Sequence, residues 1–514
     1  MTTPIQPRNL EALDADPYDV CVIGSGFVGT IVARQMASKG RRVLMIESGR
    51  GVTDWVMGKD LKQLADYEVE GDCHYPTTRT TARAVGGNSN FWTGRAERFQ
   101  PVDFTAGPYT DPACPWPVDY AELQPHYLAA EKMLNVAAGP FSEYMPPRQE
   151  PMPVPKASNI DDLKAIFADQ QITIDDSPTA KPRKGLRFFR LPKETLAEVL
   201  ETGRVQLVTG LTATRIVHDD DQRITHIVCR TADGQEKHAR AAAFVLGCGG
   251  IQTPRLMLLS DSQRFPNGLG NDSGWLGRGF NEHPAVNIYA KMPHNRHTLV
   301  PRHKVGRTHQ FYQRFFEQGL GGVHPVFIQS YLFPHHLVHY TASDAPKHVM
   351  KVLGRLAMAT VYVGCQVEMV PQRDNAVTLS TTRKDRFGDP LPKLTFNYHP
   401  KDRQLLDEVR QMLRGWLDGI GAKHPDEIDT TWARHHVGTT RMGDDPEHAV
   451  CDRHGRVHAT QNLFLSGCET FPTGGGLPPT LTACALTFRL TEHLDRWLDG
   501  HAESTAETRQ TTAA

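Results

Sequence analysis

The stretch Asp19-Val20-Cys21-Val22-Ile23-Gly24-Ser25-Gly26-Phe27-Val28-Gly29, near the start of the chain, decides the fold. Residues 19–23 are a short apolar run that ends at a glycine, which is typical of a buried parallel strand. Residues 27–39 follow a helical pattern that Gly40 ends, and residues 42–46 form a second apolar run before Glu47. The segment therefore predicts a strand, a helix and a second strand, which together make one βαβ unit.

The three glycines of this stretch have the GxGxxG spacing of dinucleotide-binding folds. Gly24 allows a tight turn, Gly26 lets the backbone approach a pyrophosphate, and Gly29 lets the helix pack on the strand. Glu47 follows Gly29 by 18 residues, where a carboxylate can accept hydrogen bonds from an adenosine ribose. The unit therefore predicts a site for the ADP part of a dinucleotide.

The other end of the chain carries a second group of candidate site residues. It reads His435-His436-Val437-Gly438-Thr439-Thr440-Arg441-Met442-Gly443, followed by Asn462-Leu463-Phe464-Leu465-Ser466-Gly467. These residues supply a histidine and another glycine-rich loop. A fold that uses both ends must bring them together, so we expect the N- and C-terminal segments to build one site.

Composition excludes several function classes. The chain has 514 residues, of which 39% are hydrophobic and 22% charged, and its net charge of -1 favours neither nucleic acid nor an anionic membrane. No apolar run approaches the roughly 18–20 residues of a spanning helix. The polar opening, residues 1–16, does not resemble a signal peptide, and nine scattered cysteines suggest free thiols, so we expect a cytoplasmic protein. We predict no metal site, and we expect His335, His336 and His339 to lie in a surface loop.

The pattern further along predicts two intertwined domains. Residues 241–246 read as a return strand of the first sheet, whereas strand-like alternation at 360–364 and 376–380 indicates an antiparallel sheet. We therefore expect an α/β Rossmann-type FAD-binding domain with an inserted α+β substrate domain built on an antiparallel sheet. The FAD-binding domain would comprise residues 17–110, 196–284 and 430–500. The substrate or cap domain would comprise 111–195 and 285–429, with flexible termini at 1–16 and 501–514.

Four further segments resemble one flavoprotein family. They are Arg83-Ala84-Val85-Gly86-Gly87-Asn88-Ser89-Asn90-Phe91-Trp92-Thr93-Gly94, Gly247-Cys248-Gly249-Gly250-Ile251-Gln252-Thr253-Pro254-Arg255-Leu256, Gly277-Arg278-Gly279-Phe280-Asn281-Glu282-His283-Pro284 and the C-terminal block. In this order they resemble the glucose-methanol-choline (GMC) oxidoreductases over nearly the whole chain. The nearest branch is the sugar- and polyol-oxidising one, which includes pyranose oxidase and fructose dehydrogenase.

The resemblance implies FAD as the cofactor and assigns residues to it. The ADP end falls to the βαβ unit, with Ala213 contacting adenine through its backbone. The glycine-rich segment after residue 83 would lie along the isoalloxazine, and a helix that opens at Pro479 and Thr480 would stabilise negative charge on the reduced flavin. The implied cofactor-binding residues are Gly24, Gly26, Gly29, Glu47, Gly86, Gly87, Asn88, Asn90, Ala213, Gly249, Gly467, Pro479 and Thr480.

The resemblance also implies a catalytic histidine. Alcohol oxidation needs a base for the hydroxyl proton while hydride leaves for flavin N5, and a neutral histidine can be that base near pH 7. The family base falls on His435, with His436 as a helper or a structural neighbour. Phe91 stands where some relatives carry a histidine bonded covalently to flavin, so we expect non-covalent FAD. Pro478 stands where relatives place an asparagine or a second histidine, and His436 and Asn90 are candidates to replace its hydrogen bond.

The predicted function is therefore FAD-dependent oxidation of a CH–OH group of a sugar, polyol or glycoside. Two alternatives stay open because of Pro478: a flavin-containing lyase of the same superfamily, and an accessory or electron-transfer flavoprotein without its own alcohol substrate. The sequence leaves open the exact substrate, the oligomeric state and the electron acceptor, which could be oxygen, a quinone or another carrier.

Overall fold

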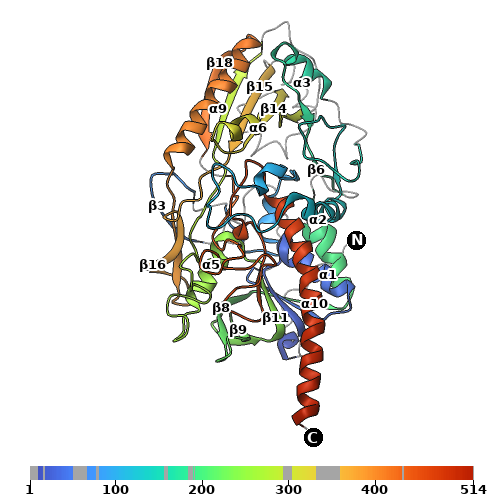
Figure 1. Ribbon diagram of the computed structural model, residues 1–514, viewed down its shortest axis with the longest axis vertical. Helices are drawn as coiled ribbons and strands as arrows, with labels where there is room; N and C mark the ends of the chain where they lie inside the picture. The colour runs from blue at the N-terminus through green and yellow to red at the C-terminus, as the bar shows by residue number, and fades with distance from the viewer. Residues whose placement is uncertain are drawn as a thin grey trace.

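The computed structural model of the chain describes residues 10–14, 18–49, 66–76, 80–154, 160–182, 189, 191–292, 304–331, 359–430 and 433–512. These residues form two main sheets, one at each end of an elongated molecule (Figure 1). Residues 335, 336 and 339, which the sequence predicts in a surface loop, lie outside the described ranges.

The first sheet is parallel and has five strands in the order β19-β11-β1-β2-β7. Its strands are β1 (Tyr18–Ile23), β2 (Val43–Glu47), β7 (Val205–Thr209), β11 (Ala241–Leu246) and β19 (Leu463–Leu465). Every residue of β2 is buried, as expected for a strand covered on both faces. Helix α1 (Phe27–Ser38) connects β1 to β2, so the predicted βαβ unit is present.

The two ends of the chain meet at this sheet. Strand β19, from the C-terminal block, pairs in parallel with β11, which in turn pairs with β1. Helix α10 (Thr480–Thr512) runs past α1 on one side of the sheet (Figure 1). Side chains from α1, α10 and the sheet share one buried apolar cluster. The sequence-based expectation that the N- and C-terminal segments come together is confirmed.

The second sheet is antiparallel and has six strands in the order β18-β12-β15-β14-β13-β5. Their bounds are β5 (Asp175–Asp176), β12 (Ala285–Lys291), β13 (Lys304–Arg307), β14 (Val323–Tyr331), β15 (Ala359–Val367) and β18 (Lys423–Thr430). Helix α9 (Pro400–Gly419) packs on it through a face that includes Leu405, Val409, Leu413 and Trp416. The three- and four-residue spacing of these side chains is that of one face of an amphipathic helix.

Smaller elements surround the two main sheets. Three further sheets are β8 (Leu211–His218) with β9 (Ile224–Thr231) and β10 (Glu236–Ala239), β16 (Ala376–Lys384) with β17 (Pro390–Thr395) and β3 (Glu68–Glu70), and β4 (Val136–Ala137) with β6 (Thr179–Ala180). Within the described ranges, the other α-helices are α2 (Tyr120–Met133), α3 (Asp161–Ile166), α4 (Ala197–Glu201), α5 (Gly249–Leu259) and α6 (Tyr312–Glu317).

Packing crosses the predicted domain boundaries, as two examples illustrate. Helix α2, from the predicted substrate segment, lies along α10, where Tyr127 Oη is 2.7 Å from Thr482 Oγ1. Helix α2 packs at this position because its apolar side chains join the buried cluster that lies against the parallel sheet. Strand β3 pairs with β17, so segments assigned to different domains share one sheet.

The termini also carry more structure than predicted. Leu10–Asp14 forms a short 3-10 helix, and α10 continues to Thr512, whereas the sequence predicts flexible segments at 1–16 and 501–514. Extending a helix that is already packed avoids the cost of nucleation, and the tail contains good helix formers such as alanine, glutamate and arginine.

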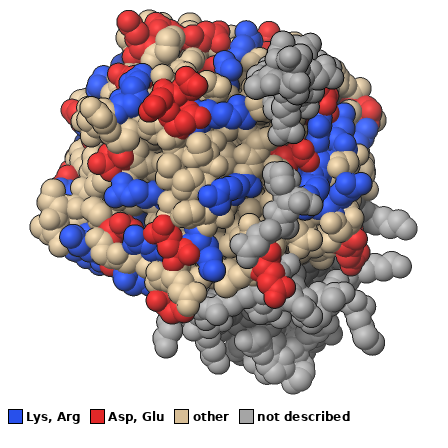
Figure 2. Space-filling view, turned by 90° about the horizontal axis from the view of Figure 1, so that it is seen from below, with Lys and Arg blue, Asp and Glu red and all other residues tan. Residues whose placement is uncertain are grey.

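Lys and Arg are interspersed with Asp and Glu on the face seen from the α10 end of the molecule (Figure 2). This mixture agrees with the near-zero net charge. Within the described ranges, no helix has both the length and the apolar character that crossing a membrane requires. The nine cysteines are free, as predicted.

Candidate functional site

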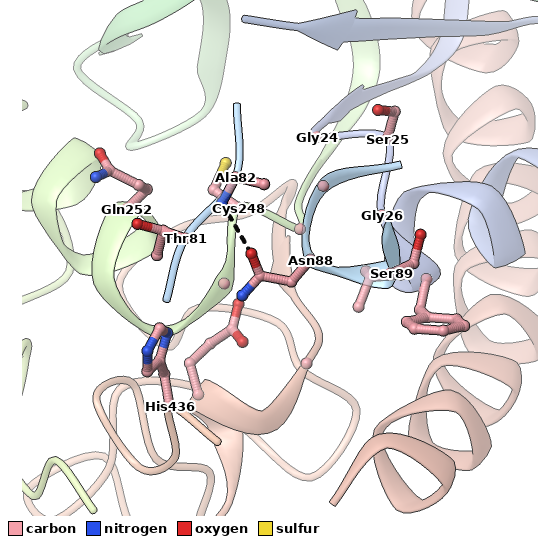
Figure 3. A pocket seen from close by; sticks show the side chains of 18 of the residues that line it. Gly24, Ser25, Gly26, Thr81, Ala82, Asn88, Ser89, Cys248, Gln252 and His436 are labelled. Atoms are coloured by element: carbon pink, nitrogen blue, oxygen red, sulfur yellow. Dashed lines mark hydrogen bonds between the residues drawn. The ribbon is translucent and has the colours of Figure 1, made fainter. Parts of the chain in front are cut away.

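One long pocket extends from the nucleotide-binding turn to the C-terminal histidines (Figure 3). Its lining includes Leu211, Thr212 and Ala213, at the start of β8, and His435 and His436 of the C-terminal segment. Of the predicted site residues, Gly24, Gly26, Glu47, Gly87, Asn88, Ala213, Gly249, Gly467, Pro479, Thr480, His435 and His436 line it. Gly29, Gly86 and Asn90 lie behind its wall rather than on it.

The turn after β1 requires its glycines for steric reasons. Gly24 has φ +102°, and a Cβ there would lie 2.5 Å from the carbonyl oxygen of Gly247. A Cβ on Gly29 would collide with the carbonyl oxygen of Gly24, so this glycine permits the close approach of α1 to β1. Around Gly26, by contrast, a Cβ would meet protein atoms only at 3.8 Å, because this residue faces the pocket. Gly24 and Gly29 therefore have the steric roles that the sequence predicts, and Gly26 leaves open space at the pocket.

Glu47 lies at the end of β2 and lines the pocket, but its carboxylate already has protein partners. Oε2 accepts from Ser25 Oγ at 2.6 Å and from Ser25 N at 3.2 Å, and Oε1 accepts from Gly49 N at 2.7 Å. Burial raises its pKa, while these bonds oppose the shift. Oε1 also accepts from Ser48 Oγ at 3.4 Å, so four protein donors hold the carboxylate and Glu47 fixes the glycine turn.

The glycine-rich segment 83–94 closes over the turn through side-chain bonds to its own backbone. Gly86 N donates to Ser25 Oγ at 2.9 Å. Asn88 accepts from Ala82 N at 2.9 Å (Figure 3) and donates to Thr80 O at 2.8 Å. Asn90 is buried and donates to the carbonyl oxygens of Val85 and Gly87 at 3.0 and 2.9 Å. Asn90 therefore holds the loop, and its amide nitrogen is not directed to a substrate.

The chemistry of the pocket wall fits a dinucleotide. Buried polar atoms of Thr81, Thr212 and Gln252 have no hydrogen-bond partner in the protein, and all three residues line the pocket. Such orphaned polar groups are rare and call for a ligand or water. Gly26 leaves room for a close backbone approach, and α10 begins at the pocket at Thr480, with Pro479 before it. These features fit FAD along the length of the pocket.

His435 is the half-buried histidine at the far end, and two neighbours hold it. Its backbone N donates to Glu282 Oε1 at 2.8 Å, and its Nδ1 lies 2.8 Å from Nδ1 of His283. Burial lowers the pKa of His435 well below the usual histidine value, and the neighbouring imidazoles and arginines add to this effect. The imidazole is therefore neutral at pH 7, as a general base must be.

His436 is engaged elsewhere. Its Nε2 is 2.8 Å from the hydroxyl of Tyr75, and that hydroxyl donates to Glu282 Oε1 at 2.8 Å. Because the tyrosine proton goes to the carboxylate, the tyrosine oxygen must accept from His436 Nε2–H. The ring is 5% exposed and packs against Phe280 and Tyr75. This arrangement favours a structural role for His436.

Glu282 organises the histidines through the backbone. Its two oxygens accept from the N–H groups of His283, Ala433 and His435, each at 2.8 Å, and from Tyr75. Glu282, His283 and His435 also have ligand atoms close enough to hold a metal ion. The carboxylate is already saturated by these four donors, and one nitrogen of His283 faces a carbonyl, so the cluster is built from hydrogen bonds.

The loop 474–476 completes the histidine end. Gly475 O and Gly474 O lie 2.7 and 3.3 Å from His283 Nε2. On its other side the loop is held by Glu368, which accepts from Gly475 N at 3.1 Å, and by Tyr312, whose hydroxyl accepts from Gly476 N at 2.7 Å. Burial raises the pKa of Glu368 to about 7. The loop therefore connects the antiparallel sheet region to the histidines.

Sequence reasoning missed Glu282, His283 and Tyr75. The segment that contains Glu282 and His283 is one of those that carry the family resemblance, but nothing in the spacing of residues 283 and 435 indicates that they touch. Pro478 is buried and does not line the pocket. His436 and Asn90, the predicted substitutes for its missing hydrogen bond, both use their donors within the protein. The polar neighbour that the structure does give to His435 is His283.

Comparison with known proteins identifies the family. Models of the GMC oxidoreductase family match residues 190–285 with their N-terminal part and 371–487 with their C-terminal part. The chain is 26% identical to paromamine 6'-oxidase of Streptomyces fradiae, over 92% of this chain and 90% of the relative. It is 28% identical to 6'''-hydroxyparomomycin C oxidase of Streptomyces lividus, over 95% and 93%.

The fold agrees with a solved structure of this kind. Formate oxidase from Aspergillus oryzae RIB40 superposes with a TM-score of 0.66 at 14% identity, and the match covers 94% of this chain and 99% of that one. The matched family segments include the start of α5, the loop after β11, the histidines and the first residues of α10. Together with the pocket geometry, these matches show that the chain belongs to the GMC oxidoreductase family.

Proposed function

We propose that this FAD-dependent oxidoreductase oxidises a CH–OH group of a glycoside or sugar, with His435 as the base that removes the hydroxyl proton. One observation supports the proposal: His435 lines the same pocket as the glycine turn that we expect to hold the dinucleotide. Bound FAD supplies the acceptor for the hydride from the carbinol carbon. The proton and the hydride then leave the same CH–OH group, which becomes a carbonyl.

The residues around His435 prepare it for this step. Its depressed pKa keeps the ring neutral at neutral pH, and Glu282 fixes the backbone of residues 433 and 435. His436 donates to Tyr75 through Nε2, so that nitrogen cannot accept a proton from a substrate. The geometry therefore favours His435 over His436 as the base.

We further propose that the antiparallel unit supplies the substrate-binding surface. His283 lies two residues before β12, Gly322 directly precedes β14, and Glu368 directly follows β15. Gly322 N and Gly475 N both donate to Glu368, so the ends of three strands converge on the loop beside the histidines. A substrate that reaches His435 would contact this edge of the antiparallel sheet.

A glycoside is the substrate class that we favour. Two relatives that align over nearly the whole chain are named as oxidases of paromamine and of 6'''-hydroxyparomomycin C, and both names describe aminoglycosides. Pro478 offers no hydrogen-bond donor where a polar group is expected to hold the oxygen of a small sugar. A larger glycoside gains binding energy from groups remote from the reacting carbon, and this binding can compensate for the missing bond.

We also propose that FAD is held without a covalent bond. Phe91 lines the pocket and has no nucleophile, and its ring lies under the guanidinium of Arg434, with Cζ 5.3 Å from the ring centroid. Acid precipitation of the purified protein should release all flavin to the supernatant. Yellow colour that stays with the pellet would contradict this proposal.

The proposed function is tested by mixing the FAD-loaded enzyme anaerobically with a panel of aminoglycosides, simple glycosides, free sugars and polyols. We expect at least one glycoside to bleach the flavin absorbance and to be recovered as an aldehyde or ketone. Product formation while the flavin stays oxidised would favour a lyase. A flavin that no alcohol reduces, but that a protein partner reduces, would favour an accessory role.

A further inference from the structure

We infer that His283 is a positioning residue that holds His435 in the tautomer protonated at Nδ1, so that Nε2 of His435 is left as the proton acceptor. The inference concerns the ground state of the two rings. Its consequence for catalysis rests on the proposed function.

The hydrogen-bond partners of His283 show which of its nitrogens carries the proton. Its Nε2 lies 2.7 Å from the carbonyl oxygen of Gly475 and 3.3 Å from that of Gly474. A carbonyl oxygen can only accept a hydrogen bond, so Nε2 of His283 must carry the hydrogen. His283 is only 1% exposed, so these carbonyl oxygens, rather than bulk solvent, are the partners of Nε2.

The charge state of His283 then determines that its other nitrogen, Nδ1, is unprotonated. Burial lowers the pKa of His283 to about 4, so the ring is neutral at pH 7. A neutral imidazole has one N–H and one lone pair. Since Nε2 carries the hydrogen, Nδ1 carries the lone pair and can only accept.

The contact between the two rings then determines the tautomer of His435. The two Nδ1 atoms are 2.8 Å apart, and the ring planes are inclined by 75° with centroids 4.9 Å apart. At this distance one proton must lie between the nitrogens, because two facing lone pairs would repel each other. That proton belongs to His435, and a neutral His435 then has its lone pair on Nε2.

The position of His283 is itself fixed from two sides. Its backbone N donates to Glu282 Oε2 at 2.8 Å, and that carboxylate also holds the backbone N of His435. The carbonyls that hold its Nε2 belong to the loop that Glu368 and Tyr312 secure through Gly475 N and Gly476 N. Both rings therefore have a single arrangement that satisfies every hydrogen bond. Without His283, His435 could adopt the tautomer protonated at Nε2, which donates where a base must accept.

The experiment is nitrogen NMR on the full-length holoenzyme labelled with ¹⁵N-histidine, without substrate, at neutral pH. Nitrogen shifts and couplings to the ring protons distinguish protonated from unprotonated nitrogens, and His435→Ala identifies the signals of His435. We expect His435 to be protonated at Nδ1 and unprotonated at Nε2. A parent enzyme whose His435 carries its proton on Nε2 overturns the inference, whatever its activity.

Two variants test the role of the acceptor. His283→Asn keeps an oxygen acceptor near the position of Nδ1 and an N–H donor, whereas His283→Leu removes both. The matched control is His454→Asn, because His454 stacks on His493 at a histidine pair remote from the site. In His283→Leu we expect the Nε2–H tautomer to appear and substrate-driven flavin reduction to slow by roughly 10²–10³-fold, since a wrong tautomer disables a base. FAD retention and substrate KM should change little, and His283→Asn should restore most of the rate.

The outcomes separate this inference from the proposed function. A His283→Leu enzyme that keeps the parent tautomer and rate contradicts the positioning role. If His283→Leu does not fold, the tautomer measured in the parent and the rate of His283→Asn decide. If His435 shows the expected tautomer while no alcohol reduces the flavin, the inference stands and the proposed function fails.

Discussion

The two ends of the pocket are built in different ways. At the nucleotide end, the backbone of one short segment forms the pocket wall, because Gly24, Gly26 and Gly29 shape a turn within a single βαβ unit. At the histidine end, side chains from distant segments meet, such as His283 and His435, which are 152 residues apart. The first end depends on local conformation and the second on contacts between segments that are far apart in the sequence.

This difference predicts that the two ends fail in different ways. Changes at the glycine turn should release FAD, and changes at the histidines should leave FAD bound but slow its reduction. Each prediction below tests one side of this separation.

The largest effect should come from the base. In His435→Ala, flavin reduction by the best substrate should slow by roughly 10²–10⁴-fold, because the hydroxyl proton loses its acceptor. His436→Ala should have a smaller effect, since its Nε2 is committed to Tyr75. Anaerobic stopped-flow absorbance gives both rates, and the flavin content of each variant shows whether FAD is retained. The reverse order of rates would assign the base to His436.

A smaller effect, of a different kind, should come from the glycine turn. Gly24→Ala places a Cβ 2.5 Å from Gly247 O, and such overpacking costs about 1–3 kcal/mol, so FAD should bind about 10- to 100-fold more weakly. Gly40→Ala is the matched control, because Gly40 also has positive φ (+81°) but has no atom within 4 Å of the added Cβ. Flavin titration of the apoproteins measures the two affinities. Equal losses in both variants would show that backbone strain alone, and not the contact, matters.

The pH dependence should report the buried environment of His435. The neutral ring is the active form, so activity is present above its pKa and is lost as the pH falls through it. Because burial and the cationic neighbours lower this pKa, the acid limb of kcat/KM should lie below about 6.5, the ordinary histidine value. Rates of flavin reduction measured across the acid range check this. A midpoint at or above that value would mean that the titrating base is another group or is more solvated.

The smallest effect should come from Pro478. Since this residue is buried outside the pocket wall, Pro478→Asn should not raise turnover on the preferred substrate. It should destabilise the protein by about 0.4–1 kcal/mol, because asparagine restores freedom to the unfolded chain. Steady-state turnover and thermal unfolding measure the two quantities. If this variant gained strong oxidation of glucose, the site would lack only the asparagine side chain that relatives carry at this position.

The same contrast explains how much could be predicted from the sequence. The βαβ unit and the start of α10 at Thr480 follow from local patterns, because apolar periodicity and glycine spacing act over a few turns of chain. The steric roles of Gly24 and Gly29 at the turn are confirmed for the same reason. The packing of α2 along α10 was not predicted. The apolar face of α2 could pack against the parallel sheet or against the antiparallel sheet, and local sequence does not decide between them.

At the histidine end only part of the site could be predicted. The family resemblance points to His435, but it gives no partner for its ring. Glu282 and His283 become visible only when the loop before β12 meets residues 433–435 and the loop 474–476. Asn90 was expected beside the isoalloxazine, yet its amide nitrogen is needed to satisfy the carbonyls of a tight loop. No sequence pattern encodes such competition for hydrogen bonds.

The most direct test of the central claim is single-turnover reduction of the bound FAD by the best glycoside of the panel, with protium or deuterium at the carbinol carbon. If the C–H hydride of a substrate held at His435 passes to FAD, the flavin should bleach in one phase and deuterium should slow that phase. A flavin that stays oxidised with every alcohol, or that bleaches at the same rate with both isotopes, would contradict the account.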